Sequence, residues 1–176
     1  MQLFESSLED LYRNAVDAFP YTRKRQHSTH PVVITEMHWT PFVGMKTLFI
    51  KGLAQSGETG KEYNPIILFK RVNFDEDAIR ITASDGLKYR FSPLSMESVD
   101  VSVRCNCSDF KYRFNYYNHL DKALYGSKTA KYESKGIGPP ANPKGLPGMC
   151  KHLMKMVKAL KESGIFTEAS IRMLDD

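Results

Sequence analysis

All three cysteines of this chain fall in two short pairs, one of which is completed by a histidine. Cys105 and Cys107 are separated by one residue, and Cys150 follows after a gap of 42 residues, two positions before His152. Three cysteines cannot all pair with one another as disulfides. Unrelated core cysteines would seldom be grouped in this way, and the residues around these pairs are too polar for a core. The spacing therefore predicts one site at which two distant segments meet.

Thiolate and imidazole groups in this number are typical metal ligands. Cys105, Cys107, Cys150 and His152 form a Cys3His set, which fills all four positions of a structural zinc site. A helix that begins near Cys150 would favour its thiolate through the partial positive charge of the helix N-terminus. An iron-sulfur cluster, which usually takes four thiolates, is the second interpretation and a redox-active dithiol is the third. His119 lies between the two pairs and is an alternative to His152.

The N-terminal part of the chain predicts a helix followed by an antiparallel sheet. A helix over about 7–18 has one apolar face, and Ser6 is placed to accept a hydrogen bond from the Glu9 amide. Short runs rich in β-branched and aromatic residues then predict strands at Val32–His38, Thr47–Ala54, Ile66–Val72, Ala78–Ala83, Lys88–Phe91 and Val99–Arg104. We expect the first helix to cover the apolar face of one small sheet.

The C-terminal part predicts a strand, a long loop and a helix. Aromatic residues alternate with polar ones from Phe110 to Tyr116, which favours a strand that continues out of the sheet, and residues 126–148 are rich in Gly and Pro. A helix follows from about Met149 to Ser163, with Gly164 as its C′ residue. We therefore predict an α+β protein with a metal-stapled strand-loop-helix region. The segment boundaries are 1–31 (helix and basic connector), 32–104 (β domain), 105–164 (metal-binding loop and helix) and 165–176 (tail).

Charge is distributed unevenly along the chain. Residues 104–161 hold 12 basic and 3 acidic residues, whereas the rest of the chain is slightly acidic. This asymmetry indicates contact with a polyanion or an acidic protein face, and a solvated lysine-rich surface explains it equally well. The predicted partner-binding residues are the basic run and four tyrosines of the aromatic-basic region, namely Arg23, Lys24, Arg25, Tyr116, Tyr117, Tyr125 and Tyr132.

The four predicted ligands resemble the SWIM-type zinc finger, whose pattern is C-x-C followed by C-x-H. That family is associated with binding nucleic acid or protein and is not catalytic in itself. A looser resemblance covers more of the chain. Four stretches resemble small virion-associated proteins of tailed bacteriophages. They are the run from Val103 to Phe110, the run from Pro147 to Leu153, the loop Gly138-Pro139-Pro140-Ala141-Asn142-Pro143 and the basic run Thr22–His27. This resemblance implies a component of the tail, the baseplate or the head-tail junction, held in a ring of subunits.

These observations lead to two functional hypotheses. The first is a non-enzymatic structural protein that contacts other protein subunits of an assembly, located in the virion or the host cytoplasm. The second is a zinc-dependent nucleic-acid-binding module, in which lysines meet phosphates and tyrosines stack on bases. An enzyme is disfavoured because a metal with four protein ligands cannot activate water. The sequence has neither a long apolar run nor the start of a secretory signal, so we expect a soluble protein without membrane contact.

Overall fold

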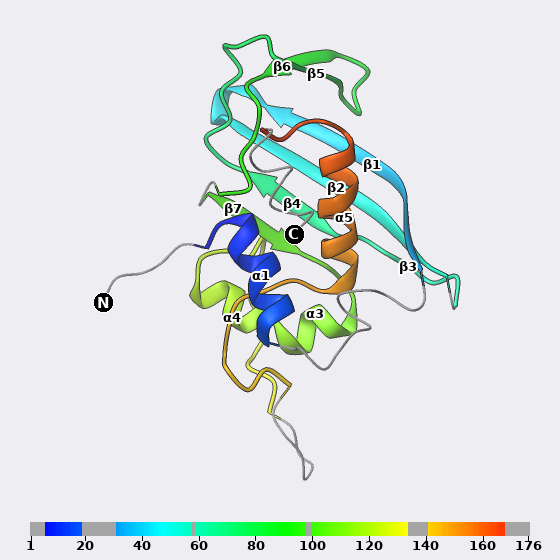
Figure 1. The fold of residues 1–176 in the computed structure, drawn as a ribbon, viewed down its shortest axis with the longest axis vertical. Helices are drawn as coiled ribbons and strands as arrows, with labels where there is room; N and C mark the ends of the chain where they lie inside the picture. The colour runs from blue at the N-terminus through cyan, green and yellow to red at the C-terminus, as the bar shows by residue number, and fades with distance from the viewer. Residues whose placement is uncertain (1–5, 19–30, 58, 98–99, 134–140, 168–176) are drawn as a thin grey trace.

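The computed structural model of the chain describes residues 6–18, 31–57, 59–97, 100–133 and 141–167. It confirms an α+β fold with an antiparallel sheet, an N-terminal helix and a C-terminal helix near the cysteines (Figure 1). The strand order of the main sheet is β1-β2-β4-β7, and β3 pairs with β2. Its strands are β1 (Val32–Phe42), β2 (Thr47–Ser56), β3 (Glu62–Tyr63), β4 (Ile66–Phe69) and β7 (Val101–Arg104).

Two of the predicted strands do not belong to this sheet. β5 (Ile79–Thr82) and β6 (Lys88–Phe91) form a separate two-stranded hairpin beyond one end of it (Figure 1). The Ser84 backbone N–H ties this hairpin to the sheet by donating to the Trp39 carbonyl oxygen at 2.9 Å. The prediction of a single sheet was therefore wrong, because within the described residues β5 and β6 pair with each other and with no strand of the main sheet.

Helix α1 (Leu8–Ala18) begins one residue later than the capping pattern indicates. The Ser7 hydroxyl accepts from the Asp10 N–H at 3.1 Å, and the Asp10 carboxylate accepts from the Ser7 N–H at 2.9 Å. The predicted pairing of Ser6 with Glu9 was wrong because the Glu9 N–H donates to the carbonyl oxygen of Met96. The reciprocal cap between Ser7 and Asp10 satisfies backbone N–H donors that a helix N-terminus leaves without a partner.

Helix α5 (Lys151–Glu162) packs across β1 and β2 (Figure 1), and α1 contributes side chains to the same hydrophobic core. A side chain at Gly52 in β2 would lie 3.3 Å from the Met156 sulfur, so glycine there permits the close approach of helix and sheet. The predicted C′ residue Gly164 has the expected positive φ of 80°. Of the predicted tail, Ile165 and Phe166 are buried, and residues 168–176 lie outside the described residues.

The aromatic segment after Cys107 is helical, so its prediction as a strand was wrong. It forms α3 (Ser108–Arg113) and α4 (Asn115–Leu120), joined at Phe114. The chain then returns beside β7, where the Val103 N–H donates to Ala123 and the Val103 carbonyl accepts from Tyr125. Along the chain, the two short helices therefore connect the last strand of the sheet, β7, to the segment that leads into the long loop.

Candidate metal centre

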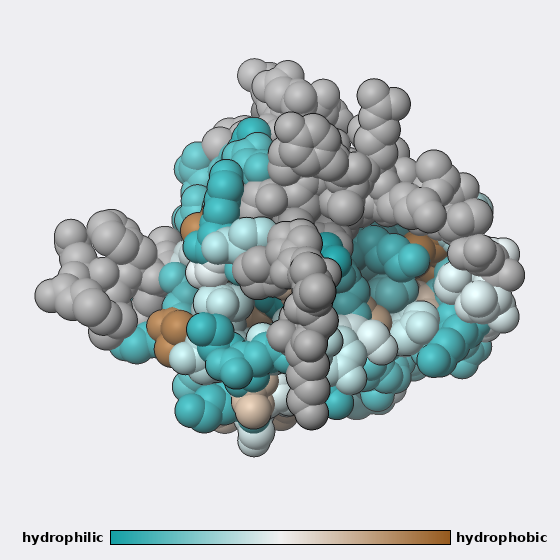
Figure 2. Space-filling view, turned by 90° about the horizontal axis from the view of Figure 1, so that it is seen from below, coloured by the Kyte–Doolittle hydropathy of each residue, from teal (hydrophilic) through white to brown (hydrophobic). Residues whose placement is uncertain are grey.

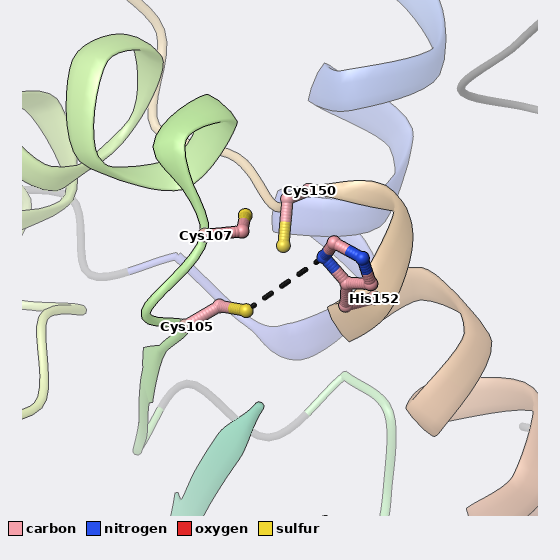
Figure 3. Close-up of side chains that lie close together, drawn as sticks. All are labelled: Cys105, Cys107, Cys150 and His152. Carbon is pink, nitrogen blue, oxygen red and sulfur yellow. Dashed lines mark hydrogen bonds between the residues drawn. The ribbon is translucent and has the colours of Figure 1, made fainter. Parts of the chain in front are cut away.

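The structure brings the four predicted ligands into one buried cluster that could hold a metal ion (Figure 3). The ligand atoms of Cys105, Cys107, Cys150 and His152 all lie within 4.8 Å of one another, and each side chain is at most 3 % exposed. Zinc-sulfur bonds of about 2.3 Å in a tetrahedron would place the ligand atoms about 3.8 Å apart. The widest separation would have to contract by about 1 Å around such an ion.

The first ligand pair lies in the turn between β7 and α3. The Asn106 side chain fixes this turn, because its carbonyl oxygen accepts from the Asn64 N–H at 2.8 Å. Cys107 is the N-cap of α3, and its sulfur accepts from the Phe110 N–H at 3.3 Å. The backbone thus directs both sulfurs toward the same interior point.

The second ligand pair lies at the start of α5, where a buried asparagine of α4 fixes its position. Cys150 is the N-cap of α5, and His152 is in its first turn. Asn118 donates to the Gly148 carbonyl at 2.9 Å and accepts from the Gly148 N–H at 2.8 Å. This pair of hydrogen bonds, which we call the Asn118 clasp, sets the chain two residues before Cys150.

Two further asparagines hold the described parts of the long loop, residues 126–133 and 141–148. The Asn142 amide donates to the carbonyl oxygens of Arg113 and Leu146, and Asn115 accepts from the Thr129 N–H at 2.7 Å. Sequence analysis missed Asn115, Asn118 and Asn142. The available signal was their polarity, since a loop with little apolar surface needs buried polar partners for its backbone groups.

The imidazole of His152 is oriented for a ligand role. Its Nδ1 lies 3.9 Å from the Cys105 sulfur and faces the cysteines, whereas its Nε2 is buried without a hydrogen-bond partner among the described residues (Figure 3). The ring of Tyr63 packs against the imidazole with a centroid distance of 4.4 Å. His119, the alternative ligand, is exposed at the end of α4 and lies outside the cluster.

The three thiols share their protons unequally. Hydrogen bonds from Cys105 and then Cys150 lower the pKa of Cys107, because they stabilise its thiolate. Donation to Cys107 raises the pKa of Cys105, and burial raises the pKa of Cys150. Without a cation the cluster therefore favours ionisation at Cys107 over ionisation at Cys105 or Cys150. A bound metal ion would replace the protons of those two thiols.

The structure separates the predicted partner-binding residues. Tyr132 is 48 % exposed, whereas Tyr125 packs on Phe49, and Tyr116 and Tyr117 are half-buried against each other. Arg23, Lys24 and Arg25 lie outside the described residues.

Comparisons of the chain with protein-family profiles, with curated proteins and with solved structures give no match. The resemblances to the SWIM-type zinc finger and to phage virion proteins stay predictions, and the candidate site rests on its own geometry. Within the described ranges, no helix is both long and apolar enough to cross a membrane.

Proposed function

We propose that this chain is a non-enzymatic structural protein whose C-terminal half is held together by one zinc ion. The observation that carries the proposal is the convergence of four buried ligand atoms within 4.8 Å, from two segments that are 42 residues apart in sequence. Three thiolates and one imidazole are a donor set typical of structural zinc. An iron-sulfur cluster is the weaker proposal, because the common clusters take four cysteines and the set contains three.

A structural rather than catalytic role follows from the closed ligand set. Catalytic zinc sites keep a position open for water or substrate, and here four protein groups would fill a tetrahedron. All four side chains are also buried, so a substrate would have no direct path to the ion. In this proposal the zinc ion joins the β7–α3 turn to the start of α5.

We further propose that the protein acts through contacts with other subunits of an assembly. The turn between β1 and β2, which contains the 3-10 helix η1 (Val43–Met45), supports this proposal because it exposes three large apolar side chains. Phe42, Val43 and Met45 are 45 %, 49 % and 74 % exposed. Apolar side chains grouped on a surface often mark interaction sites. The proposed ring of subunits in a phage virion rests on the sequence resemblance alone.

Metal analysis of the purified protein, with matched histidine variants, tests the zinc site. We expect about one equivalent of zinc in the wild-type protein, because the described part of the chain contains one such donor set. Cys150→Ser and His152→Ala should lose the metal, whereas His119→Ala should retain it because His119 lies outside the cluster. Zinc-free wild-type protein, or iron with visible absorbance, would contradict the zinc assignment.

A further inference from the structure

Two tyrosines form an exposed aromatic pair on the surface of the metal-stapled region. The ring centroids of Tyr112 and Tyr132 are 4.8 Å apart with an angle of 53° between the ring planes. Tyr112 is 46 % exposed and Tyr132 is 48 % exposed, so about half of each side chain remains in contact with water. Tyr112 was not among the partner-binding residues predicted from the sequence. Exposed aromatic rings in contact with each other offer planar faces to a ligand.

Three lysines lie on the two segments that carry this pair, and no ion pair among the described residues neutralises them. The ammonium of Lys111 lies 5.3 Å from the centroid of the Tyr112 ring, and Lys128 and Lys131 are in the loop that carries Tyr132. The ion pairs of the described residues include none of these three lysines. We call Lys111, Tyr112, Lys128, Lys131 and Tyr132 the aromatic-basic surface.

Acidic residues near the aromatic-basic surface are few and are mostly engaged elsewhere. Residues 104–161 contain three acids, namely Asp109, Asp121 and Glu133. Asp109 pairs with Arg113 at 3.3 Å, and Asp121 accepts from the Ser6 N–H at 3.0 Å. Glu133, next to Tyr132, is the remaining acid and has no partner within the described part of the chain. The segment that carries this surface therefore has a net positive charge.

The fold holds both sides of this surface in place. Arg104 donates to the Ser127 carbonyl at 2.7 Å, and the Thr129 N–H donates to the Asn115 side chain at 2.7 Å. Helix α3 carries Lys111 and Tyr112, and its N-cap is Cys107, one of the proposed zinc ligands. A preorganised surface loses little entropy when a ligand binds.

We propose that the aromatic-basic surface binds single-stranded nucleic acid. Base stacking on exposed aromatic rings combined with lysine contacts to phosphates is how proteins hold single strands without reading their sequence. The described residues that are visible in the view from below are mostly hydrophilic (Figure 2), which fits a charged ligand. The inference rests on the proposed function in one respect, since the zinc ion fixes the start of α3.

Fluorescence anisotropy of labelled dT12 with the zinc-loaded protein tests this inference. We expect binding that weakens as salt rises from about 50 to 200 mM, and loss of one phosphate contact should reduce the slope of log K against log salt by about 0.7. Tyr112→Ala and Tyr132→Ala should each weaken binding roughly 5- to 150-fold, whereas Tyr112→Phe and Tyr132→Phe, which keep the ring, should bind like the wild type.

Charge variants provide matched controls. Lys111→Ala and Lys131→Ala should weaken binding, whereas Lys51→Ala, which removes one exposed lysine of β2, should leave it unchanged. Glu133→Lys should tighten binding because it replaces the one unpaired acid beside the tyrosine pair. Zinc content and circular dichroism of each variant show that it is folded.

Three outcomes would overturn the inference: no binding of dT12 at about 50 mM salt, equal binding by the tyrosine-to-alanine variants, or equally tight binding of poly-glutamate. The last outcome would indicate an acidic protein partner instead. Metal content measured in the same samples keeps the two proposals apart. If the zinc-loaded protein does not bind dT12, only the nucleic-acid proposal is refuted. If the wild-type protein contains no zinc, the metal proposal is refuted whether or not the protein binds dT12.

Discussion

Gly148 has no space for a side chain, and its backbone is fixed on both sides. A Cβ atom there would lie 2.6 Å from Cε1 of the Phe114 ring. Phe114 is 1 % exposed and joins α3 to α4, so its ring has little freedom to move. The N–H and the carbonyl of Gly148 both bond to Asn118. A displacement at Gly148 would therefore reach Cys150 two residues later.

Gly148→Ala should destabilise the protein and weaken zinc binding together. We expect a loss of about 1–3 kcal/mol in the free energy of unfolding, the usual cost of forcing an extra methyl group into a packed interior. Gly44→Ala is the matched control, because no atom lies within 4 Å of the Cβ position at Gly44. Denaturant unfolding and a zinc competition assay measure both effects. A Gly148→Ala protein as stable as Gly44→Ala would show that Phe114 and the Asn118 clasp do not constrain the site.

The protonation of the thiols predicts how metal affinity depends on pH. The pKa of Cys105 and that of Cys150 are raised in the metal-free cluster, so both groups keep their protons at neutral pH. Zinc binding must release these two protons, whereas the lowered pKa of Cys107 favours ionisation of that group before the metal binds. Acid therefore opposes binding, and from about pH 7 to 8 the zinc Kd should fall about 100-fold. Competition against a chelator, corrected for its own protonation, gives the slope, and a Kd independent of pH would contradict the shared-proton arrangement.

At the scale of elements, the helices α3 and α4 show where the sequence pattern was misread. The alternating aromatics from Phe110 onward favoured a strand, yet Tyr112 is exposed while Phe110, Phe114 and Asn118 are buried. These three buried positions have the spacing of four residues that places side chains on one helical face. Asn118 hid this helical period in the sequence, because a polar residue is not expected at a buried position. Its burial depends on hydrogen bonds to Gly148, which is 30 residues away in sequence.

Most of the other elements follow from local patterns and were predictable to within a few residues, whereas the two-residue strand β3 (Glu62–Tyr63) was not predicted. Helices α1 and α5 have apolar faces, and β2 buries alternate residues in the core that both helices share. The separate β5–β6 hairpin was not predictable, because strand periodicity does not determine which strands pair. The ligand set was predictable because metal ligands are few in type and strict in spacing, whereas the asparagines that hold the loop have no such pattern.

At the scale of the whole molecule, the candidate metal centre is part of the common hydrophobic core. One cluster of buried side chains includes Leu8 of α1, Ile50 of β2 and Leu153 of α5, and it contains all three cysteines. Residues from each of the four predicted segments take part in this cluster, with Ile165 coming from the last. The exact boundaries of those segments stay a prediction. A perturbation at the cluster should therefore spread beyond the loop.

Removal of zinc should lower the stability of the entire described fold. The single tryptophan, Trp39, lies in β1 and reports on the sheet rather than on the ligands. Zinc at about 100 times its Kd contributes about 2.7 kcal/mol, so a chelator should lower the Tm by roughly 5–10 °C. Because the core is continuous, Trp39 fluorescence and far-ultraviolet circular dichroism should shift by the same amount, and His152→Ala should melt at the chelated Tm with or without zinc. If the chelator shifted only the helical signal and left the Trp39 transition in place, the sheet and the metal-stapled region would be two independent folding units.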